Sequence, residues 1–205
     1  MKIAIIGAGN VGGTLGQGWA KRGHAVTFAV RDPNDPKVQA LLKEASGATA
    51  AKVPEAVAAN DVVVLATPWD ATEAALRGAG TLAGKVLLDC TNPLKADLTG
   101  LAVGHTISAA EIIAGRAQGA RVVKIFNTTG YPNMADPRFP DGPAVMFYCG
   151  DDDAAKALAA KLATDLGFDA QDAGGLTVAR LLEPYARLWI HLAINQGFGT
   201  GFAFK

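Results

Sequence analysis

Residues 6–12 read IGAGNVG, and this stretch decides the fold. Gly7, Gly9 and Gly12 have the G-x-G-x-x-G spacing, directly after the apolar run 2–6 and at the start of a helical pattern over 11–22. In a dinucleotide-binding loop, the first glycine allows a tight turn, the second lets a pyrophosphate approach, and the third lets helix and strand pack closely. The stretch therefore predicts a Rossmann-type nucleotide site, with a glycine-rich turn that binds nothing as the alternative.

Short β-branched runs and helical patterns alternate through the first two thirds of the chain. The apolar runs cover 2–6, 25–30, 61–67, 85–89, 121–126 and 143–148, and the helical patterns cover 11–22, 38–44, 54–59 and 70–78. Nearly continuous apolar runs are typical of strands that are buried on both faces. The pattern predicts an α/β fold, a Rossmann-type doubly wound parallel sheet with a small C-terminal helical extension. We expect residues 1–150 to form the NADP-binding domain, and 151–205 to form the helical extension that completes the site in the same compact unit.

Three acidic residues, 151–153, precede an alanine-rich helical segment that ends at Gly167. Such acids can cap the free N–H groups of a helix and complement its dipole, whereas a metal site would need further ligands. No second ligand cluster lies nearby in the sequence. We therefore interpret the acids as a helix cap and predict no metal site.

The composition indicates a globular protein without a polyanionic partner. Half of the 205 residues are hydrophobic, and 19 basic residues balance 19 acidic ones. This balance argues against nucleic acid or an anionic membrane as a partner. No signal peptide or membrane-spanning stretch is evident, and Cys90 and Cys149 are too few for a disulfide framework. We expect a cytoplasmic protein with two buried free thiols.

The segment AVRDP, residues 29–33, bears on the choice of coenzyme. Arg31 lies 19 positions after Gly12, where the second strand should end and where Rossmann proteins recognise the ribose 2′ position. A guanidinium there can bind a 2′-phosphate, whereas a carboxylate would accept hydrogen bonds from a 2′-hydroxyl. Arg31 therefore favours NADPH. A register shift of one residue would give this position to Asp32, and an ion pair with Asp32 or Asp35 is the structural alternative.

Thr67, Pro68 and Trp69 follow the third apolar run, at the edge of the sheet where ligands bind. Pro68 would fix the turn and Trp69 could offer a flat face to a ring, or could cap the core instead.

Asn92, Asn127 and Thr128 follow two later runs and could orient a nicotinamide without being ionised, although each could also belong to an ordinary turn. His191 on the C-terminal helix is a further positioning candidate, or a core histidine. No catalytic acid/base pair is evident, and Arg180 and Glu183 at i, i+3 suggest a local ion pair. The predicted cofactor-binding residues are Gly7, Gly9, Asn10, Val11, Gly12, Arg31, Thr67, Pro68, Trp69, Asn92 and Asn127.

Several stretches occur together and in order: ATPWDA (66–71), DCTNPL (89–94), VVKIFNTTGYPNMADP (122–137), FYCGDDDAAK (147–156) and DAGGLTVARLLEP (172–184). With the glycine loop, they resemble the NADP oxidoreductases that depend on the deazaflavin coenzyme F420, and the cytoplasmic domains of six-transmembrane ferric reductases look similar. The resemblance covers nearly the whole chain. It implies NADP(H) bound at the ends of the parallel strands, with the C-terminal part as the second wall of the site. It also implies coenzyme F420 or a flavin as the small-molecule hydride partner.

Our leading hypothesis is an NADPH-dependent oxidoreductase that transfers a hydride to a deazaflavin- or flavin-like acceptor. The alternatives are a reductase of a small imine or carbonyl, with His191 or Tyr185 as proton donor, and a non-catalytic NADP(H)-binding redox sensor. The tail NQGFGTGFAFK, residues 195–205, carries three phenylalanines that should be buried, either on the chain itself or on a second subunit. We predict a homodimer through the C-terminal helix.

Overall fold

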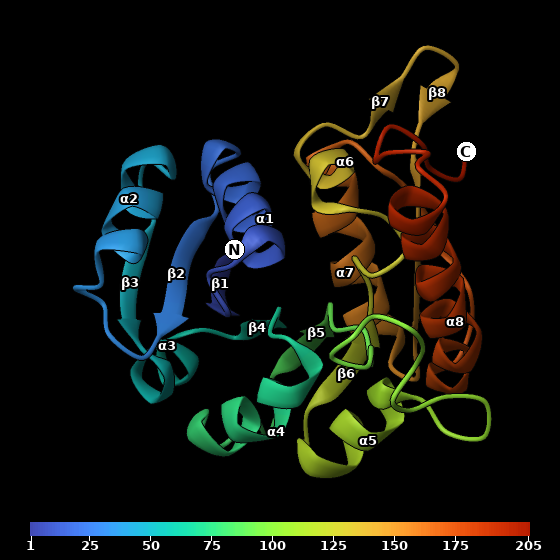
Figure 1. Cartoon of the computed structure of the whole chain (residues 1–205). Helices are drawn as coiled ribbons and strands as arrows, with labels where there is room; N and C mark the ends of the chain where they lie inside the picture. The colour runs from blue at the N-terminus through green and yellow to red at the C-terminus, as the bar shows by residue number, and fades with distance from the viewer.

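The computed structural model describes residues 1–205 and confirms the Rossmann-type α/β fold (Figure 1). Its strands are β1 (Lys2–Ile6), β2 (Ala25–Val30), β3 (Thr49–Lys52), β4 (Val62–Leu65), β5 (Val86–Asp89), β6 (Arg121–Lys124), β7 (Arg138–Phe139), β8 (Gly142–Pro143), β9 (Val145–Gly150) and β10 (Asp169–Asp172). Its α-helices are α1 (Asn10–Lys21), α2 (Pro36–Glu44), α3 (Val53–Ala59), α4 (Trp69–Gly78), α5 (Ala109–Arg116), α6 (Tyr131–Ala135), α7 (Asp153–Leu166) and α8 (Ala179–Ile190). A 3-10 turn (Leu176–Val178) precedes α8 and a π-helical turn (His191–Asn195) follows it.

Eight of the strands form one sheet in the order β10-β9-β6-β5-β4-β1-β2-β3. The strands from β3 to β6 are parallel, whereas β9 pairs with β6 in the antiparallel sense and β10 runs parallel to β9. The sixth apolar run is therefore a strand, but one that reverses direction. The sheet also has a topological switch point between β1 and β4, which is where doubly wound folds bind ligands.

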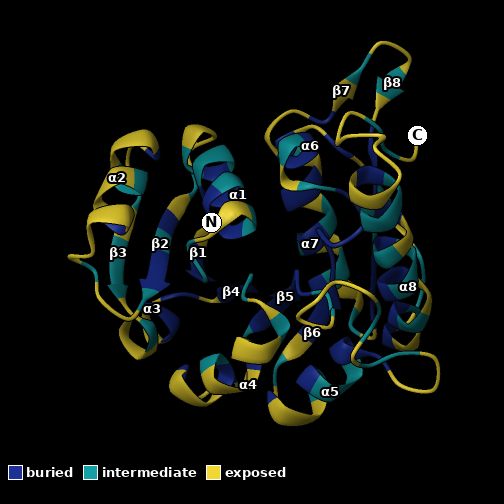
Figure 2. Ribbon diagram, viewed as in Figure 1, coloured by how far each residue is buried: buried dark blue, intermediate teal, exposed yellow.

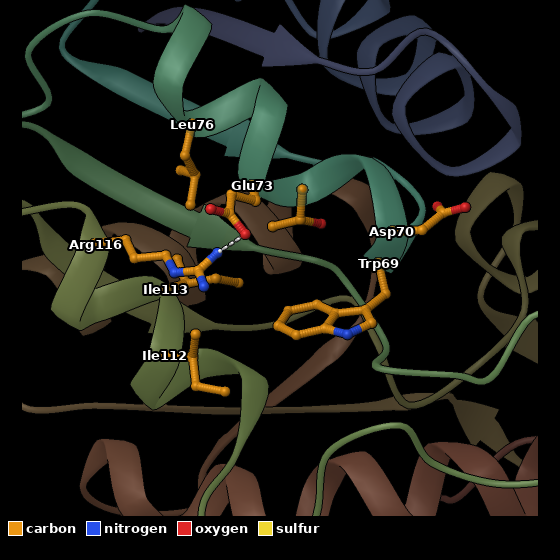
Figure 3. Close-up of a pocket in the computed structure, with 8 residues that line it drawn as sticks. Trp69, Asp70, Glu73, Leu76, Ile112, Ile113 and Arg116 are labelled. Carbon is orange, nitrogen blue, oxygen red and sulfur yellow. Dashed lines mark ion pairs between the residues drawn. The ribbon is translucent and has the colours of Figure 1, made fainter.

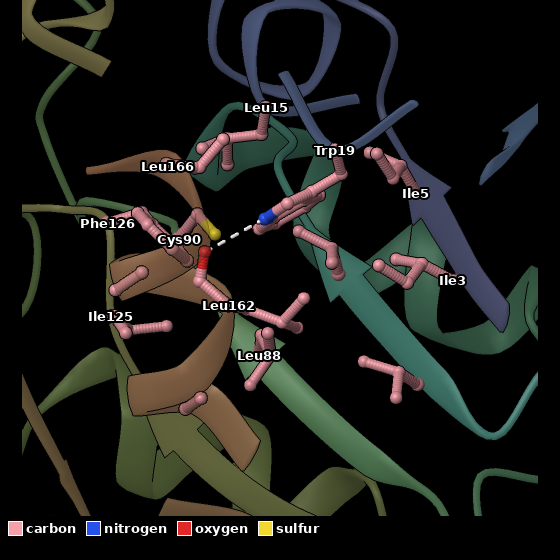
Figure 4. Packing of buried hydrophobic residues seen from close by; sticks show 14 of the residues in the cluster. Ile3, Ile5, Leu15, Trp19, Leu88, Cys90, Ile125, Phe126, Leu162 and Leu166 are labelled. Carbon is pink, nitrogen blue, oxygen red and sulfur yellow. Dashed lines mark hydrogen bonds between the residues drawn. The ribbon is translucent and has the colours of Figure 1, made fainter. Parts of the chain in front are cut away.

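Helices cover both faces of the sheet, and each face has its own core. On one face, α1 and α7 pack on the strands through Leu15, Trp19 and Leu162, and Trp19 Nε1 donates to the Leu162 carbonyl at 3.0 Å (Figure 4). On the other face, α3, α4, α5 and α8 pack on alternate strand residues such as Ala4 and Ile6. The central strands, such as β1, β4 and β5, are correspondingly the most buried part of the molecule (Figure 2).

The sequence patterns missed β3, α5, α6 and the small β7–β8 hairpin. The strand β3 reads TAAK and has no β-branched run, because it lies at the edge of the sheet. In contrast, α5 did carry a signal. Ser108 and Glu111 form a capping box, in which the Ser108 hydroxyl accepts from the Glu111 N–H and Glu111 accepts from the Ser108 N–H.

Within the acidic run 151–153, Asp152 caps α7 as predicted, whereas Asp151 binds another segment. Asp152 Oδ1 accepts from the Ala155 N–H at 2.7 Å at the start of α7, and Asp151 accepts from the Leu176 N–H at 2.7 Å. Both cysteines are free and buried, and burial raises the pKa of each thiol, that of Cys149 to about 12. No helix combines the length and the apolar character that crossing a bilayer requires.

The strand register places the ends of the parallel strands in one row. Ala29, Ile6, Leu65, Asp89 and Lys124 are successive partners across β2, β1, β4, β5 and β6. Because adjacent strands lie about 4.8 Å apart, the row spans roughly 14 Å from β1 to β6. Every loop that carries a predicted site residue begins at this edge.

Candidate functional site

The glycine loop after β1 is built as the motif predicts, and each glycine has a distinct environment. Gly7 has a φ of +105°, and a Cβ there would lie 2.5 Å from the Ala66 carbonyl oxygen. A Cβ at Gly12 would lie 1.9 Å from the Gly7 carbonyl oxygen. A Cβ at Gly9, in contrast, would meet no atom within 4 Å. Gly7 and Gly12 are thus needed for the fold, whereas Gly9 leaves open space at the start of α1.

The N-terminus of α1 offers free backbone donors toward that space. Gly9 is the N-cap residue, so no side chain caps the helix, and the first turn contains no acidic residue. Asn10 and Gly9 are exposed. Uncapped N–H groups and the positive end of a helix dipole attract a pyrophosphate, so Gly9, Asn10, Val11 and Gly12 can hold one through their backbone.

Arg31 follows the last residue of β2, is exposed, and has no carboxylate within 4.0 Å. Both neighbouring acids bind backbone instead. Asp32 Oδ1 accepts from the Asn34 N–H at 2.9 Å, and Asp35 caps α2 by accepting from the Lys37 N–H at 2.8 Å. The alternative of an ion pair with Asp32 or Asp35 is therefore not observed, and the guanidinium is free to bind a ligand.

Thr67 and Pro68 follow β4 beside the glycine loop, but Trp69 lies slightly apart. The Thr67 and Thr72 hydroxyl groups are hydrogen-bonded at 3.0 Å, and Pro68 is the N-cap residue of α4. The Trp69 indole is half-buried against the core beneath α4 and lines a groove of about 200 Å³ between α4 and α5 (Figure 3). In this position Trp69 caps the core, which is the alternative to a ligand-stacking role.

Asn92 and Asn127 come together from the ends of β5 and β6. Asn127 Nδ2 donates to Asn92 Oδ1 at 3.2 Å and to the Leu182 carbonyl of α8 at 3.1 Å, while Asn92 Nδ2 donates to the Asn127 carbonyl at 3.2 Å. Asn127 Oδ1 is buried and accepts no hydrogen bond. Exchanging the amide nitrogen and oxygen would place an acceptor against two acceptors, so the observed orientation leaves this oxygen for another donor.

The turn that presents Asn127 is strained. Phe126 has a φ of +59°, which costs a non-glycine residue about 1–2 kcal/mol, and its ring packs edge-on against Trp19 and Phe168. The Thr128 hydroxyl donates to Met146 Sδ at 3.7 Å inside the core. Of the residues predicted in this turn, Asn127 therefore reaches the site with its side chain and Thr128 does not.

A buried ionic cluster lies beneath this end of the site, and sequence reasoning missed it. Lys124 Nζ contacts Asp89 Oδ2 at 2.9 Å, Glu183 Oε1 at 3.2 Å and the Thr91 carbonyl, and all three charged side chains are fully buried. Burial lowers the pKa of Lys124, but the two carboxylates outweigh this effect and raise the pKa above its ordinary value. The cluster joins the ends of β5 and β6 to α8.

The expected Arg180–Glu183 pair does not form. Arg180 instead binds Glu111 of α5 at 2.6 and 2.9 Å, while Glu183 accepts from the Ala109 and Ala110 N–H groups at the start of α5. Residues at i, i+3 share a helix face, but here α5 supplies better partners for both. The sequence did contain two signals for this buried cluster, namely Lys124 within an apolar run and Glu183 within a helical segment.

His191 lies at the other end of α8, about 13 Å along the helix axis from Leu182. Its Nε2 is 3.3 Å from Gln196 Nε2, and no hydrogen bond joins it to Asn92 or Asn127. The structure thus brings the glycine loop, Thr67, Asn92 and Asn127 to one edge of the sheet, places Arg31 beside them, and leaves His191 apart.

Comparison with known proteins identifies relatives that are reductases. Residues 2–93 match the family model described as "NADP oxidoreductase coenzyme F420-dependent". The chain is 33% identical to the F420-dependent NADP reductase of Methanothermobacter marburgensis, over 96% of this chain and 94% of that protein. It is also 30% identical to metalloreductase STEAP3 of Rattus norvegicus, over 89% of this chain but only 36% of STEAP3.

Solved structures agree with this assignment. A candidate F420-dependent NADP-reductase from Arthrobacter sp. FB24 has a TM-score of 0.91 and 37% identity, covering 100% of this chain and 98% of that one. A reductive aminase from Aspergillus terreus, solved with an NADPH analogue, has a TM-score of 0.70 and 25% identity, with 62% of its chain covered. The match over nearly the whole length of the Methanothermobacter marburgensis reductase, together with the family model over residues 2–93, shows that this chain belongs to the coenzyme F420-dependent family of NADP oxidoreductases.

Proposed function

We propose that this NADP-dependent oxidoreductase transfers a hydride between NADP(H) and a deazaflavin- or flavin-like ring. The observation that carries the proposal is the open space at Gly9, beside an uncapped helix and an unpaired Arg31. These features fit a pyrophosphate and a 2′-phosphate on neighbouring loops.

In this proposal, residues at different strand ends bind different parts of NADP(H). The backbone at Gly9 and Gly12 holds the pyrophosphate, and Arg31 holds the 2′-phosphate. Asn92 and Asn127 orient the nicotinamide end, where the buried Asn127 Oδ1 can accept a hydrogen bond from a ligand amide or hydroxyl. The bound nicotinamide supplies or takes up the hydride. Holding two rings close, aligned and away from water provides much of the rate of such a step, without a proton donor.

The C-terminal part forms the second wall of the site in this proposal. The Leu182 carbonyl of α8 fixes Asn127, and Glu183 joins α8 to Lys124 and to the start of α5. Residues 151–205 thereby complete the site as part of one compact unit with residues 1–150.

A homodimer through α8 is the second part of the proposal. Leu181 and Leu188 lie seven residues apart on the outer face of α8 and are 70% and 53% exposed. Ile194 and Phe198 continue this apolar surface beyond the helix, and are 63% and 64% exposed. A second copy of the same helix would cover it.

Arg31→Ala tests the cofactor assignment. Loss of the charge-assisted hydrogen bonds to the 2′-phosphate, worth about 2 kcal/mol, should raise the Kd for NADPH about 30-fold. The Kd for NADH should change less than about twofold, because NADH lacks that phosphate. Both constants follow from titration of reduced-nicotinamide fluorescence.

Asp32→Ala is the matched control and should leave NADPH binding unchanged. If the affinity for NADPH were unchanged in Arg31→Ala but changed in Asp32→Ala, Asp32 would be the residue that recognises the ribose 2′ position.

A second experiment tests the acceptor, by measuring the loss of NADPH absorbance in the presence of coenzyme F420 or flavins. Tight NADPH binding without turnover of any acceptor would favour a redox sensor.

A reductase of small imines or carbonyls is the second candidate, since a reductive aminase shares the fold. Such a reaction needs a proton donor near the nicotinamide. Of the two candidate donors, Tyr185 packs against Phe147 and Phe204, and His191 lies beside Gln196. If His191→Ala or Tyr185→Phe abolished one limb of the pH–rate profile for an imine, this second candidate would be favoured over ring-to-ring transfer.

A further inference from the structure

Helix α8 carries a polar stripe, and one of its members lacks partners. Arg180, Glu183, Arg187 and His191 follow one another at spacings of three, four and four residues, so they share a face of the helix. Arg180 and Glu183 are bound to α5 and Lys124, as described above. Arg187 differs, because its Nε and Nη1 atoms are buried and donate to nothing in the protein.

Arg187 is partly buried, and its two buried nitrogen atoms have an incomplete set of partners. Its single hydrogen bond runs from Nη2 to the Thr99 carbonyl at 3.3 Å, and it has no carboxylate within 4.0 Å. An arginine stays charged in proteins, so loss of its proton cannot relieve the burial. Buried donors in native proteins are nearly always paired, and the exceptions call for a functional explanation.

Arg187 is linked to both segments that hold Asn92 and Asn127. Thr99 belongs to the segment between β5 and α5 that also contains Asn92. On the helix, Leu182 accepts from Asn127 five residues before Arg187, which corresponds to roughly 7 Å along the axis. A hydride acceptor next to the nicotinamide would border the same loop and the same helix.

We propose that Arg187 recognises an anionic group, a phosphate or a carboxylate, on the hydride acceptor. Nη2 carries two hydrogens and uses one on Thr99, so one edge of the guanidinium keeps two parallel donors for a bidentate contact. Arg187 then selects acceptors that carry negative charge over neutral ones with the same ring. This inference rests on the proposed function, because it needs an acceptor beside the nicotinamide.

FMN and riboflavin test the proposal, since they share one ring system and differ by a phosphate. Their Kd values are measured by quenching of flavin fluorescence with NADP+ present, so that no turnover occurs. The wild-type protein should bind FMN about tenfold or more tightly than riboflavin. Arg187→Met should remove this preference by weakening FMN alone, and Arg187→Lys should restore part of it.

Thermal unfolding separates recognition from a structural role. Arg187→Met removes buried donors without partners, so the Tm of the ligand-free protein should stay equal or rise. Arg77→Met is the matched control, because it removes the same charge from an exposed position of α4 and should leave flavin preference unchanged.

The outcomes separate this inference from the proposed function. A lowered Tm with equal weakening of both flavins would make Arg187 structural and overturn the inference. NADPH oxidation by riboflavin without any preference for FMN, or absence of binding of either flavin, would also overturn it. Failure of NADPH to bind would instead refute the proposed function, and the inference with it, whatever the flavin preference of the Arg187 variants.

Discussion

Gly9 and Gly16 show that one residue type serves two purposes along α1. A Cβ at Gly16 would lie 2.4 Å from Phe28 Cζ, so this glycine lets the helix approach β2. A Cβ at Gly9 would meet nothing, and the backbone there has a φ of −83°, which any residue can adopt. The fold therefore does not explain a glycine at position 9, whereas a ligand against the backbone does.

Gly9→Ala should separate binding from folding. The added methyl group would occupy the space of the pyrophosphate, so we expect the Kd for NADPH to rise about tenfold or more, equivalent to about 1.4 kcal/mol. The free energy of unfolding should change by less than about 0.5 kcal/mol. Urea denaturation and nicotinamide fluorescence measure the two quantities.

Gly16→Ala provides the contrast, because overpacking against Phe28 should lower the free energy of unfolding by about 1–3 kcal/mol. Unchanged NADPH affinity in Gly9→Ala would contradict a pyrophosphate at this loop.

At the scale of elements, α5 and α8 are joined by ionic contacts rather than by apolar packing alone. The hydrogen bond from Arg180 is the main cause that holds the pKa of Glu111 at about 2, with burial opposing it and Ser108 adding to it. A carboxyl group with a lowered pKa stabilises the folded state above its ordinary pKa of about 4.3, and this contribution is lost as the pH falls toward 2.

Glu111→Gln tests this contact while keeping a residue that suits the capping box. At pH 6 we expect the variant to lose about 1–2 kcal/mol of unfolding free energy. Between pH 5 and pH 2 the wild type should lose more stability than the variant, since the variant has no carboxylate to protonate. Urea midpoints across this range provide the measurement.

Glu73→Gln, which removes an exposed carboxylate paired with Arg116, serves as the control for loss of charge. If wild type and Glu111→Gln had parallel pH profiles, the ion pair with Arg180 would not stabilise the α5–α8 junction.

At the scale of the whole molecule, the C-terminal tail folds back on its own chain and packs on one side of α8, through Trp189 and Tyr185. Phe202 stacks on Trp189 at 5.2 Å, and the Phe204 carbonyl accepts from the Val145 N–H at 2.8 Å. The outer leucines of α8 remain exposed, as does Phe198. The tail thus covers apolar residues of its own chain. The exposed leucines of α8 and Phe198 are proposed to be covered by a second copy.

The double variant Leu181→Lys/Leu188→Lys should be monomeric where the wild type is a dimer. Each leucine buried in an interface is worth about 1.5–3 kcal/mol, so the dimer Kd should rise by about two orders of magnitude or more. Sedimentation velocity gives the mass, and NADPH binding shows that the subunit is intact. Ala74→Lys, at an exposed position of α4, is the control for added charge and should leave the mass unchanged. A wild-type monomer at all concentrations would refute the interface.

The parts of the site that could be predicted are those whose sequence pattern involves residues close together along the chain. The glycine spacing and the position of Arg31 are read from one β-α-β unit, and each strand run is itself a local pattern. The structure agrees with the predicted fold. Other features depended on packing between distant segments and could not be predicted. They are the orientation of Trp69, the contact of the Thr128 hydroxyl with the core, and the distance of His191 from the site. The Arg180–Glu183 prediction was wrong for the same reason, since the partners of both lie some 70 residues away.

The sequence by itself determined most strands and helices of the main sheet, the nucleotide loop and the cap of α7, because periodicity, glycine spacing and capping act between residues close along the chain. Only the tertiary structure decided the reversed direction of β9, the buried cluster around Lys124, and the isolation of Arg187 from any carboxylate. The physical reason is that a charge buried far from its sequence neighbours takes the partners that the fold brings to it, and no local pattern records them.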